Sequence, residues 1–222
     1  MFALIHIKFL EQPLFNYFLG SFTSLFSVVN PLGMMPVFLA LTSEHPIEYR
    51  QLMARKASIY VIAILGFFLF AGTFIMSFFG FSLISLRIAG GLIVMRSGFN
   101  LLNGTDKSVN LSDQGAQEAK VKADISLTPL ALPLLSGPGS IATVISLSTH
   151  TNGIGLHTLF ILLAIIAIGV ISFIILSVAQ KLLPILGRAG LEAVTKIMGF
   201  IAMTVGVQFI ITGVELLFQE MS

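Results

Sequence analysis

Charged residues divide the chain into long apolar segments. No Asp, Glu, Lys or Arg occurs between positions 11 and 44, 56 and 87, or 124 and 181. A membrane span needs roughly 20 apolar residues, so the first two segments each fit one span. The third fits two, separated at the polar turn 149–153, and two further apolar runs complete a set of six. The predicted spans are 18–42, 57–79, 84–102, 125–149, 157–181 and 194–217.

The spans group into two halves. The first half covers 18–102, a hydrophilic linker follows at 103–123, and the second half covers 124–222. Residues 1–17 are interpreted as an N-terminal extracytoplasmic or interfacial segment of the mature chain, because Lys8 comes late and no small-residue cleavage site follows.

Composition supports the membrane interpretation and narrows the function. Hydrophobic residues make up 56% of the chain and charged residues 10%, against about 25% charged in soluble domains. The net charge of +2 comes from residues scattered between apolar runs, which argues against nucleic acid as a partner. The absence of cysteine excludes disulfides and thiolate chemistry.

Basic residues predict the orientation. Ten of the 12 Lys and Arg residues lie in or near the loops after spans one, three and five, and only Lys8 and Arg87 lie on the other side. Cytoplasmic loops are enriched in Lys and Arg. Both termini are therefore expected outside the cytoplasm, and the location is predicted to be a bacterial inner membrane.

The two halves share sequence patterns. Aligning Pro31 with Pro138 also pairs Val37 with Val144 and Thr42 with Thr149. At a similar offset, two stripes of small residues coincide, namely Gly90, Ser97 and Gly104 with Gly199, Gly206 and Gly213. Each half has three spans, an odd number, so the halves must be inverted in the membrane, as in many secondary transporters. The stripes alone are explained by helix packing.

Spans one and four are each interrupted near their middle. The first break is Asn30-Pro31-Leu32-Gly33, and the second is Ser136-Gly137-Pro138-Gly139. A proline stops or kinks a helix, and Asn or Ser followed by Pro is typical of a helix start. Two half-helices are thus predicted to begin at the midplane, with their positive dipole ends converging on one point.

Such a point suits a zwitterion. Backbone N–H groups would bind a carboxylate, and the carbonyls ending the first half-helices would bind an ammonium or a cation. An ordinary proline kink is the structural alternative. The candidate substrate-binding residues are Ser27, Asn30, Pro31, Gly33, Ser136, Gly137, Pro138, Gly139, Ser140 and Thr143.

Several chemistries are not expected. The carboxylates and histidines lie outside the spans or near their ends, which argues against a midplane proton relay. The chain contains neither an HExxH motif nor paired aspartates within the spans, which argues against intramembrane proteolysis. We therefore expect no enzyme, no metal site and no cofactor, and the sequence leaves a coupling cation open. Arg96 either extends to the cytoplasmic surface or faces the transport pathway.

The segments NPLGMMPVFLALT and PLALPLLSGPGSIATVI resemble those of the MarC family, which is related to small neutral amino acid transporters. The resemblance covers about 18–217. It implies a six-span fold and places Asn30, Pro31 and Gly33 in the family's first motif and Gly137, Pro138 and Gly139 in its second.

Three functional hypotheses follow. The first is a secondary transporter or exporter of a small neutral amino acid that works by rocking of two inverted halves. The second is an exporter of drugs or larger amphiphiles, although the chain has no tryptophan and no midplane carboxylate to bind a cationic drug. The third is a channel or a non-transporting membrane scaffold. The expected partners are a small-molecule substrate and the lipid bilayer, and the sequence leaves the oligomeric state open.

Overall fold

The computed structural model describes residues 14–42, 45–103, 135–149 and 155–221. These residues form helices and contain no strand, which confirms the all-helical prediction for this part of the chain. Residues 1–13 of the predicted N-terminal segment 1–17, most of the linker, the first part of span four and the polar turn after Thr149 lie outside the described residues. Residues 14–17 of that segment belong to the first helix. The helices are α2 (Leu14–Val29), α3 (Met35–Thr42), α4 (Ile47–Phe79), α5 (Leu83–Asn103), α7 (Pro138–Thr149) and α8 (Leu156–Met221).

Helix α8 consists of two arms that fold back on each other. Its apolar stretches are Leu156–Ala179, here the first arm, and Ala189–Glu220, the second arm. Between them Gly187 has φ 63° and ψ −178°, so the helix is broken at that residue. This conformation is accessible almost only to glycine, which explains how the chain reverses direction there.

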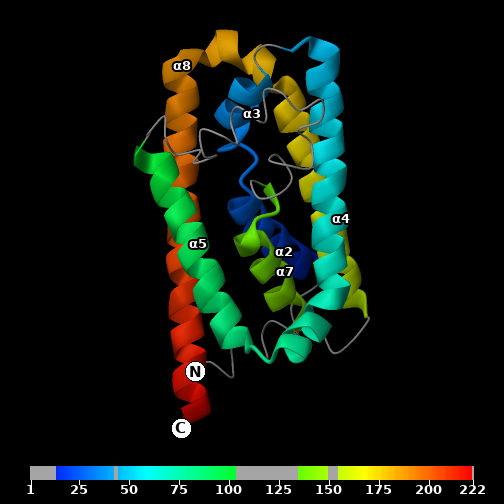
Figure 1. Cartoon of the computed structure of the whole chain (residues 1–222), viewed down its shortest axis with the longest axis vertical. Coiled ribbons are helices and arrows are strands. Elements are labelled where there is room, and N and C mark those ends of the chain that lie inside the picture. The colour runs from blue at the N-terminus through cyan, green and yellow to red at the C-terminus, as the bar shows by residue number, and fades with distance from the viewer. Residues whose placement is uncertain (1–13, 43–44, 104–134, 150–154, 222) are drawn as a thin grey trace.

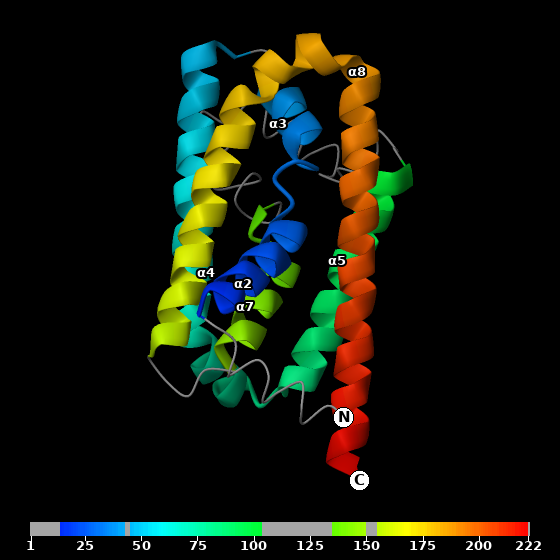
Figure 2. The same cartoon turned by 180° about the vertical axis from the view of Figure 1, so that it is seen from behind.

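Long helices flank a set of short ones (Figures 1 and 2). Helix α4 and the first arm of α8 lie on one side, and α5 and the second arm lie on the other. Helices α2, α3 and α7 lie between these pairs. The short helices, which contain the sequence motifs, are therefore held inside a frame of long ones.

The chain alternates in direction through this frame. Helices α2 and α3 run one way, α4 runs back, and α5 runs forward again (Figure 1). Helix α7, the first arm and the second arm then repeat the alternation starting from the opposite direction (Figure 2).

The buried core is apolar and lies around the short helices. Leu25 of α2, Leu65 of α4 and Ile165 of the first arm are fully buried, and Phe38 of α3 is almost so. Burying a side chain of this size contributes roughly 1.5–3 kcal/mol. The core thus fixes the positions of the breaks that follow α2 and precede α7.

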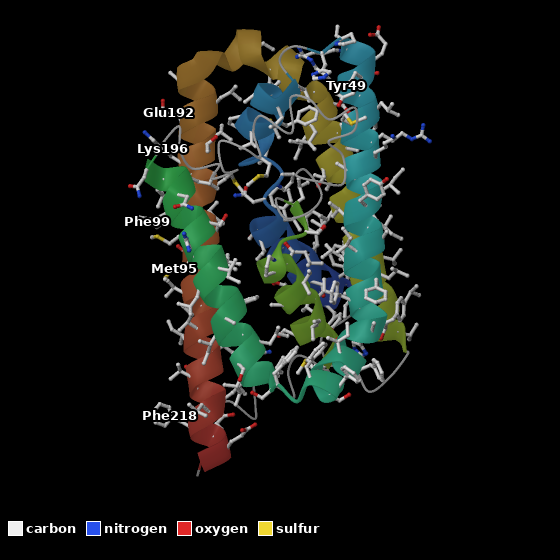
Figure 3. The ribbon with its side chains drawn as sticks, viewed as in Figure 1. Tyr49, Met95, Phe99, Glu192, Lys196 and Phe218 are labelled. Carbon is white, nitrogen blue, oxygen red and sulfur yellow. The ribbon has the colours of Figure 1, made fainter. Side chains whose placement is uncertain are left out.

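The outer surface is also apolar. In the most apolar stretch of α4 only 22% of the residues are buried, and in the most apolar stretch of the second arm only 28% are buried. Phe74 is 68% exposed and Phe218 65%, and Figure 3 shows Phe218 on the outside of the bundle. Soluble proteins rarely expose apolar area on this scale, so this surface is suited to lipid.

Within the described part of the chain, three helices are long and apolar enough to cross a membrane: α4 and the two arms of α8. Helix α4 begins ten residues earlier than the predicted span at 57–79, and its first turns contain the charged residues Glu48, Arg50 and Arg55. Glu192 and Lys196 form an ion pair of 2.7 Å near the start of the second arm (Figure 3), a place compatible with the membrane surface.

Candidate functional site

The first break is built around Asn30. Helix α2 ends at Val29, and Asn30 adopts a left-handed conformation with φ 48°. Its backbone N–H donates to Phe26 O at 2.9 Å, and its Oδ1 accepts from the Gly33 N–H at 3.0 Å. Asn30 is only 3% exposed. The Asn30 amide thus makes a hydrogen bond to the following backbone, but this bond closes the turn at 30–33 and caps no helix, because α3 begins only at Met35.

Gly33 is required by this turn. A Cβ atom at Gly33 would lie 2.5 Å from Asn30 Nδ2 and 2.8 Å from Asn30 Oδ1. Any side chain here would displace the amide that holds the turn together.

The second half-helix of span one starts later than the motif predicts. Pro31 was expected at the first helical position, but residues 31–34 form a turn and α3 begins at Met35. The reason is the left-handed Asn30, which interrupts the helix without changing the overall chain direction, and a hydrogen bond from Met35 N to Leu32 O at 3.2 Å that closes the following turn.

The second break does start its helix at proline. Pro138 is the first residue of α7, as predicted, and Gly137 O accepts the bond from Ile141 N at 3.1 Å. A proline suits this position because the missing N–H has no partner there in any case. Pro129 and Pro133, which precede the break, lie outside the described residues.

Ser136 does not cap α7, contrary to our prediction. Its side chain is fully buried, and Oγ has no hydrogen-bond partner among the described residues. Gly137 separates it from Pro138, so the position next to the helix is taken by a residue without a side chain. Ser140 bridges the break instead, because its Oγ donates to Leu135 O at 3.0 Å.

The two breaks meet at a cavity of about 170 Å³. Five of the predicted residues line it: Asn30, Gly137, Pro138, Gly139 and Ser140. The other five do not. Ser27 Oγ and Thr143 Oγ1 donate to carbonyls of their own helices, at Thr23 and Gly139, both at 2.8 Å. Pro31, Gly33 and Ser136 support the breaks without lining the cavity.

The sequence analysis missed the wall formed by α5. Ile93, Val94 and Ser97 line the cavity, together with Val28, Met34 and Ala202. The sequence predicts Ser97 only as a small residue for helix packing. The apolar lining residues give no signal in a sequence, since every span is rich in such residues.

Gly139 is held against this wall. A Cβ atom at Gly139 would collide with Val94 Cγ2 and lie 3.3 Å from Val28 Cγ1. The glycine thus permits close approach of α7 to α5 and α2. A valine here would act by displacing Val94.

The predicted stripe of small residues on the second arm of α8 lies at the contact with α5. On α5 the residues at this contact are displaced by one position from the predicted stripe. On the second arm, Cβ atoms at Gly199, Gly206 and Gly213 would all collide with α5. On α5 the residues in contact are Gly91 and Gly98, where Cβ atoms would meet the Gly206 carbonyl at 2.7 Å and the Gly199 carbonyl at 2.5 Å.

The predicted α5 stripe has a different role. Gly90 faces α7, where a Cβ atom would lie 2.6 Å from Ala142 Cβ, and Ser97 lines the cavity. Gly104 lies outside the described residues. Neighbouring small residues on α5 therefore serve two faces, one towards α8 and one towards α7 and the cavity.

Two arginines on α5 have contrasting environments. Arg96, considered above as a pathway residue, is exposed and does not line the cavity. Arg87 is only 9% exposed, and its Nε donates to Ser146 Oγ of α7 at 2.9 Å. From the sequence, Arg87 contributes only to the predicted orientation, and its burial against α7 is not predicted.

The cavity offers backbone groups and hydroxyls. No Asp, Glu, His, Lys or Arg belongs to its described lining, and no cluster of metal-ligating side chains occurs among the described residues. The N-terminal turn of α7 faces it, and the first N–H groups of a helix have no partner within the helix. Such a turn carries a partial positive charge that favours an anion.

Comparison with known proteins agrees with this architecture. The sequence profile of the MarC family, described as MarC family integral membrane proteins, matches residues 15–218. The UPF0056 membrane protein YvbG of Bacillus subtilis is 37% identical over 206 residues, which cover 92% of this chain and 97% of that protein. The UPF0056 membrane protein YhcE of Escherichia coli is 34% identical over 212 residues, 95% of this chain and 96% of that protein.

A similar relative occurs in an archaeon. The UPF0056 membrane protein MJ1677 of Methanocaldococcus jannaschii is 36% identical over 200 residues, 90% of this chain and 97% of that protein. No solved structure matches the chain. The names of these relatives designate membrane proteins and state no reaction.

The apolar outer surface, the long helices and these relatives define a multi-pass integral membrane protein. The chain belongs to the MarC family.

Proposed function

We propose that this protein is a secondary transporter or exporter of a small zwitterionic solute, with a neutral amino acid such as glycine or alanine as the first candidate. The observation that carries the proposal is the cavity at which the two chain breaks meet, lined by Asn30 from one break and by residues 137–140 from the other. Broken helices at a shared central cavity are typical of the binding sites of secondary transporters.

The polarity of the site suits a carboxylate on one side. The first turn of α7 lines the cavity with Pro138, Gly139 and Ser140. The first N–H groups of a helix have no partner within the helix, and Gly139 has no side chain that would cover its backbone. Because Asn30 already accepts from the Gly33 N–H, α7 supplies most of the positive potential. Carbonyls at the end of α2 provide acceptors for an ammonium group.

The alternating chain directions support the proposed mechanism. Helices α2 to α5 follow a forward, back, forward path, and α7 with the two arms of α8 follow the reverse path. We infer six spans in two inverted halves, whose rocking about the cavity would expose it to each side in turn. In this proposal the membrane is the bacterial inner membrane and both termini are extracytoplasmic.

The size of the cavity separates the first two hypotheses. Pockets for drug-sized ligands occupy about 300–1,000 Å³, whereas this cavity has about 170 Å³. A small solute is therefore favoured over drugs or larger amphiphiles. The third hypothesis, a channel or a non-transporting scaffold, differs from both transporters because it would show no saturable exchange.

Counterflow in liposomes tests the proposal. Purified protein is reconstituted into vesicles loaded with unlabelled alanine, and uptake of radiolabelled alanine is measured against empty vesicles. We expect saturable accumulation that alanine inhibits and alaninamide does not, because the amide lacks the carboxylate. Transport of large amphiphiles without amino acid exchange would support the second hypothesis, and non-saturable flux would support a channel.

A paired variant connects the transport to the cavity. Gly137→Val adds a side chain at the cavity lining, while Gly66→Val adds one on α4 where a Cβ atom meets nothing within 4 Å. We expect the first to abolish counterflow and the second to preserve it. Equal transport by both folded variants would show that the breaks are ordinary kinks.

A further inference from the structure

A second hollow lies on the outside of the bundle, between α4 and the first arm of α8. Its volume is about 410 Å³, and α4 contributes Arg55, Ser58, Ile59 and Ile62 to it. These positions follow the spacing of residues on one helical face. At a rise of about 1.5 Å per residue, Ser58 lies about 4.5 Å beyond Arg55 along the helix, and Ile62 lies about 6 Å further.

The groove begins at the boundary between polar and apolar sequence. Arg55 belongs to the charged start of α4, and no charged residue occurs from Ala57 to the end of the helix at Phe79. A stretch of this length spans the hydrocarbon core of a bilayer, which is about 30 Å thick. Arg55 is exposed and therefore lies near the level of lipid headgroups, while Ile62 lies at the level of acyl chains.

The first arm provides an apolar wall and floor. Gly169 forms the floor, because a Cβ atom there would collide with Ile62 and lie 3.3 Å from Ser58 O. Val170 and Phe173 form the wall and are 49% and 36% exposed. The surface available beyond Arg55 and Ser58 is thus hydrocarbon.

Ser58 carries an unsatisfied hydroxyl in this groove. The residue is 4% exposed, and its Oγ has no hydrogen-bond partner among the described residues. A serine in a membrane helix commonly bonds a carbonyl of the preceding turn, as Thr23 and Ser27 do on α2. An unpaired buried hydroxyl destabilises a fold, so an acceptor supplied from outside the chain would stabilise the structure.

We propose that this groove is a binding site for an anionic phospholipid. The phosphate binds at Arg55, an ester carbonyl accepts a hydrogen bond from Ser58, and one acyl chain lies along Ile59, Ile62 and Val170. The order of cation, hydroxyl and apolar surface along the groove matches the order of phosphate, ester and acyl chain in a phospholipid. An apolar surface for a second copy of this chain would not explain a cation and an unpaired hydroxyl at one end.

Native mass spectrometry of the purified protein tests the proposal. Delipidated protein in detergent is titrated with phosphatidylglycerol or with phosphatidylcholine of the same acyl chains. We expect a preference for phosphatidylglycerol that Arg55→Gln reduces about fivefold, because one cation near an anionic lipid surface contributes about 1 kcal/mol. Arg96→Gln is the matched control, since Arg96 is also exposed but lies outside the groove, and it should leave the preference unchanged.

Two further measurements separate other occupants. Val170→Trp fills the groove from an exposed position, so binding of both lipids should fall, and inorganic phosphate alone should not compete. Equal binding of the two lipids by the wild type, or equal losses in the two arginine variants, would overturn the proposal. A dimer that Val170→Trp dissociates would identify the groove as a contact between copies instead.

Discussion

A single methyl group added at the contact between α5 and the second arm of α8 is predicted to lower the stability of the fold. A Cβ atom at Gly206 would collide with Met95 N and lie 2.7 Å from Gly91 O. Both are backbone atoms, so the obstruction cannot be relieved by a rotamer change. The helices must move apart, and overpacking of this kind costs about 1–3 kcal/mol.

Gly206→Ala is best compared with Gly66→Ala. Both glycines lie inside helices, so both substitutions gain about the same helix propensity, roughly 1 kcal/mol. At Gly66 a Cβ atom meets nothing within 4 Å, so the gain is not offset. The difference between the two variants therefore measures the obstruction at the helix contact.

Thermal unfolding in detergent, followed by far-UV circular dichroism, provides the assay. For a chain of this size 1 kcal/mol corresponds to about 2–4 °C, so Gly206→Ala should melt about 2–12 °C below Gly66→Ala. Gly206→Leu should reduce the yield of folded protein further. If the two alanine variants melt at the same temperature, then α5 and α8 are not packed backbone against backbone, and the reasoning is refuted.

Three other predictions follow from the site and the topology. Asn30→Ala removes the acceptor of the Gly33 N–H and should lower stability by about 1 kcal/mol. Ser27→Ala, in the preceding helix α2, is the control, and equal melting temperatures would contradict the role of the Asn30 amide. Ser146→Ala removes an acceptor of Arg87 and should cost about 1.5–3 kcal/mol; Ser146→Thr, which keeps the hydroxyl, should recover most of the loss. A reporter that is active only in the cytoplasm should be silent when fused to the C-terminus, since Lys and Arg favour cytoplasmic loops. A strong signal would show that the predicted orientation is wrong.

Features of this chain that depend on neighbouring residues could be predicted from the sequence, and features that depend on distant residues could not. Asn30 and Pro138 lie where the motifs placed them because short-range hydrogen bonds and proline effects act within one turn. The buried position of Arg87 depends on Ser146, 59 residues away, and no local pattern reports such a contact. The walls supplied by Val94 and Ala202 were unpredictable for the same reason.

The stripe on α5 shows a different limit. This helix contains the adjacent pairs Gly90-Gly91 and Ser97-Gly98, so small residues at a spacing of seven describe two faces. Successive residues point about 100° apart on a helix. The sequence supplies both stripes equally, and only the positions of α7 and α8 decide which face each one meets.

The break at Gly187 has a consequence for how this chain tolerates insertions. In the segment 180–188 that joins the two arms, Gly187 alone has non-helical backbone angles, so the connection contains no loop that could absorb a change in length. One residue inserted in the helix between Gly187 and Gly199 would rotate every later side chain by about 100°, and the three glycines would no longer face α5. We therefore expect relatives with a glycine at this bend to keep the number of residues from the bend to the first contact glycine constant, even where the residues themselves change.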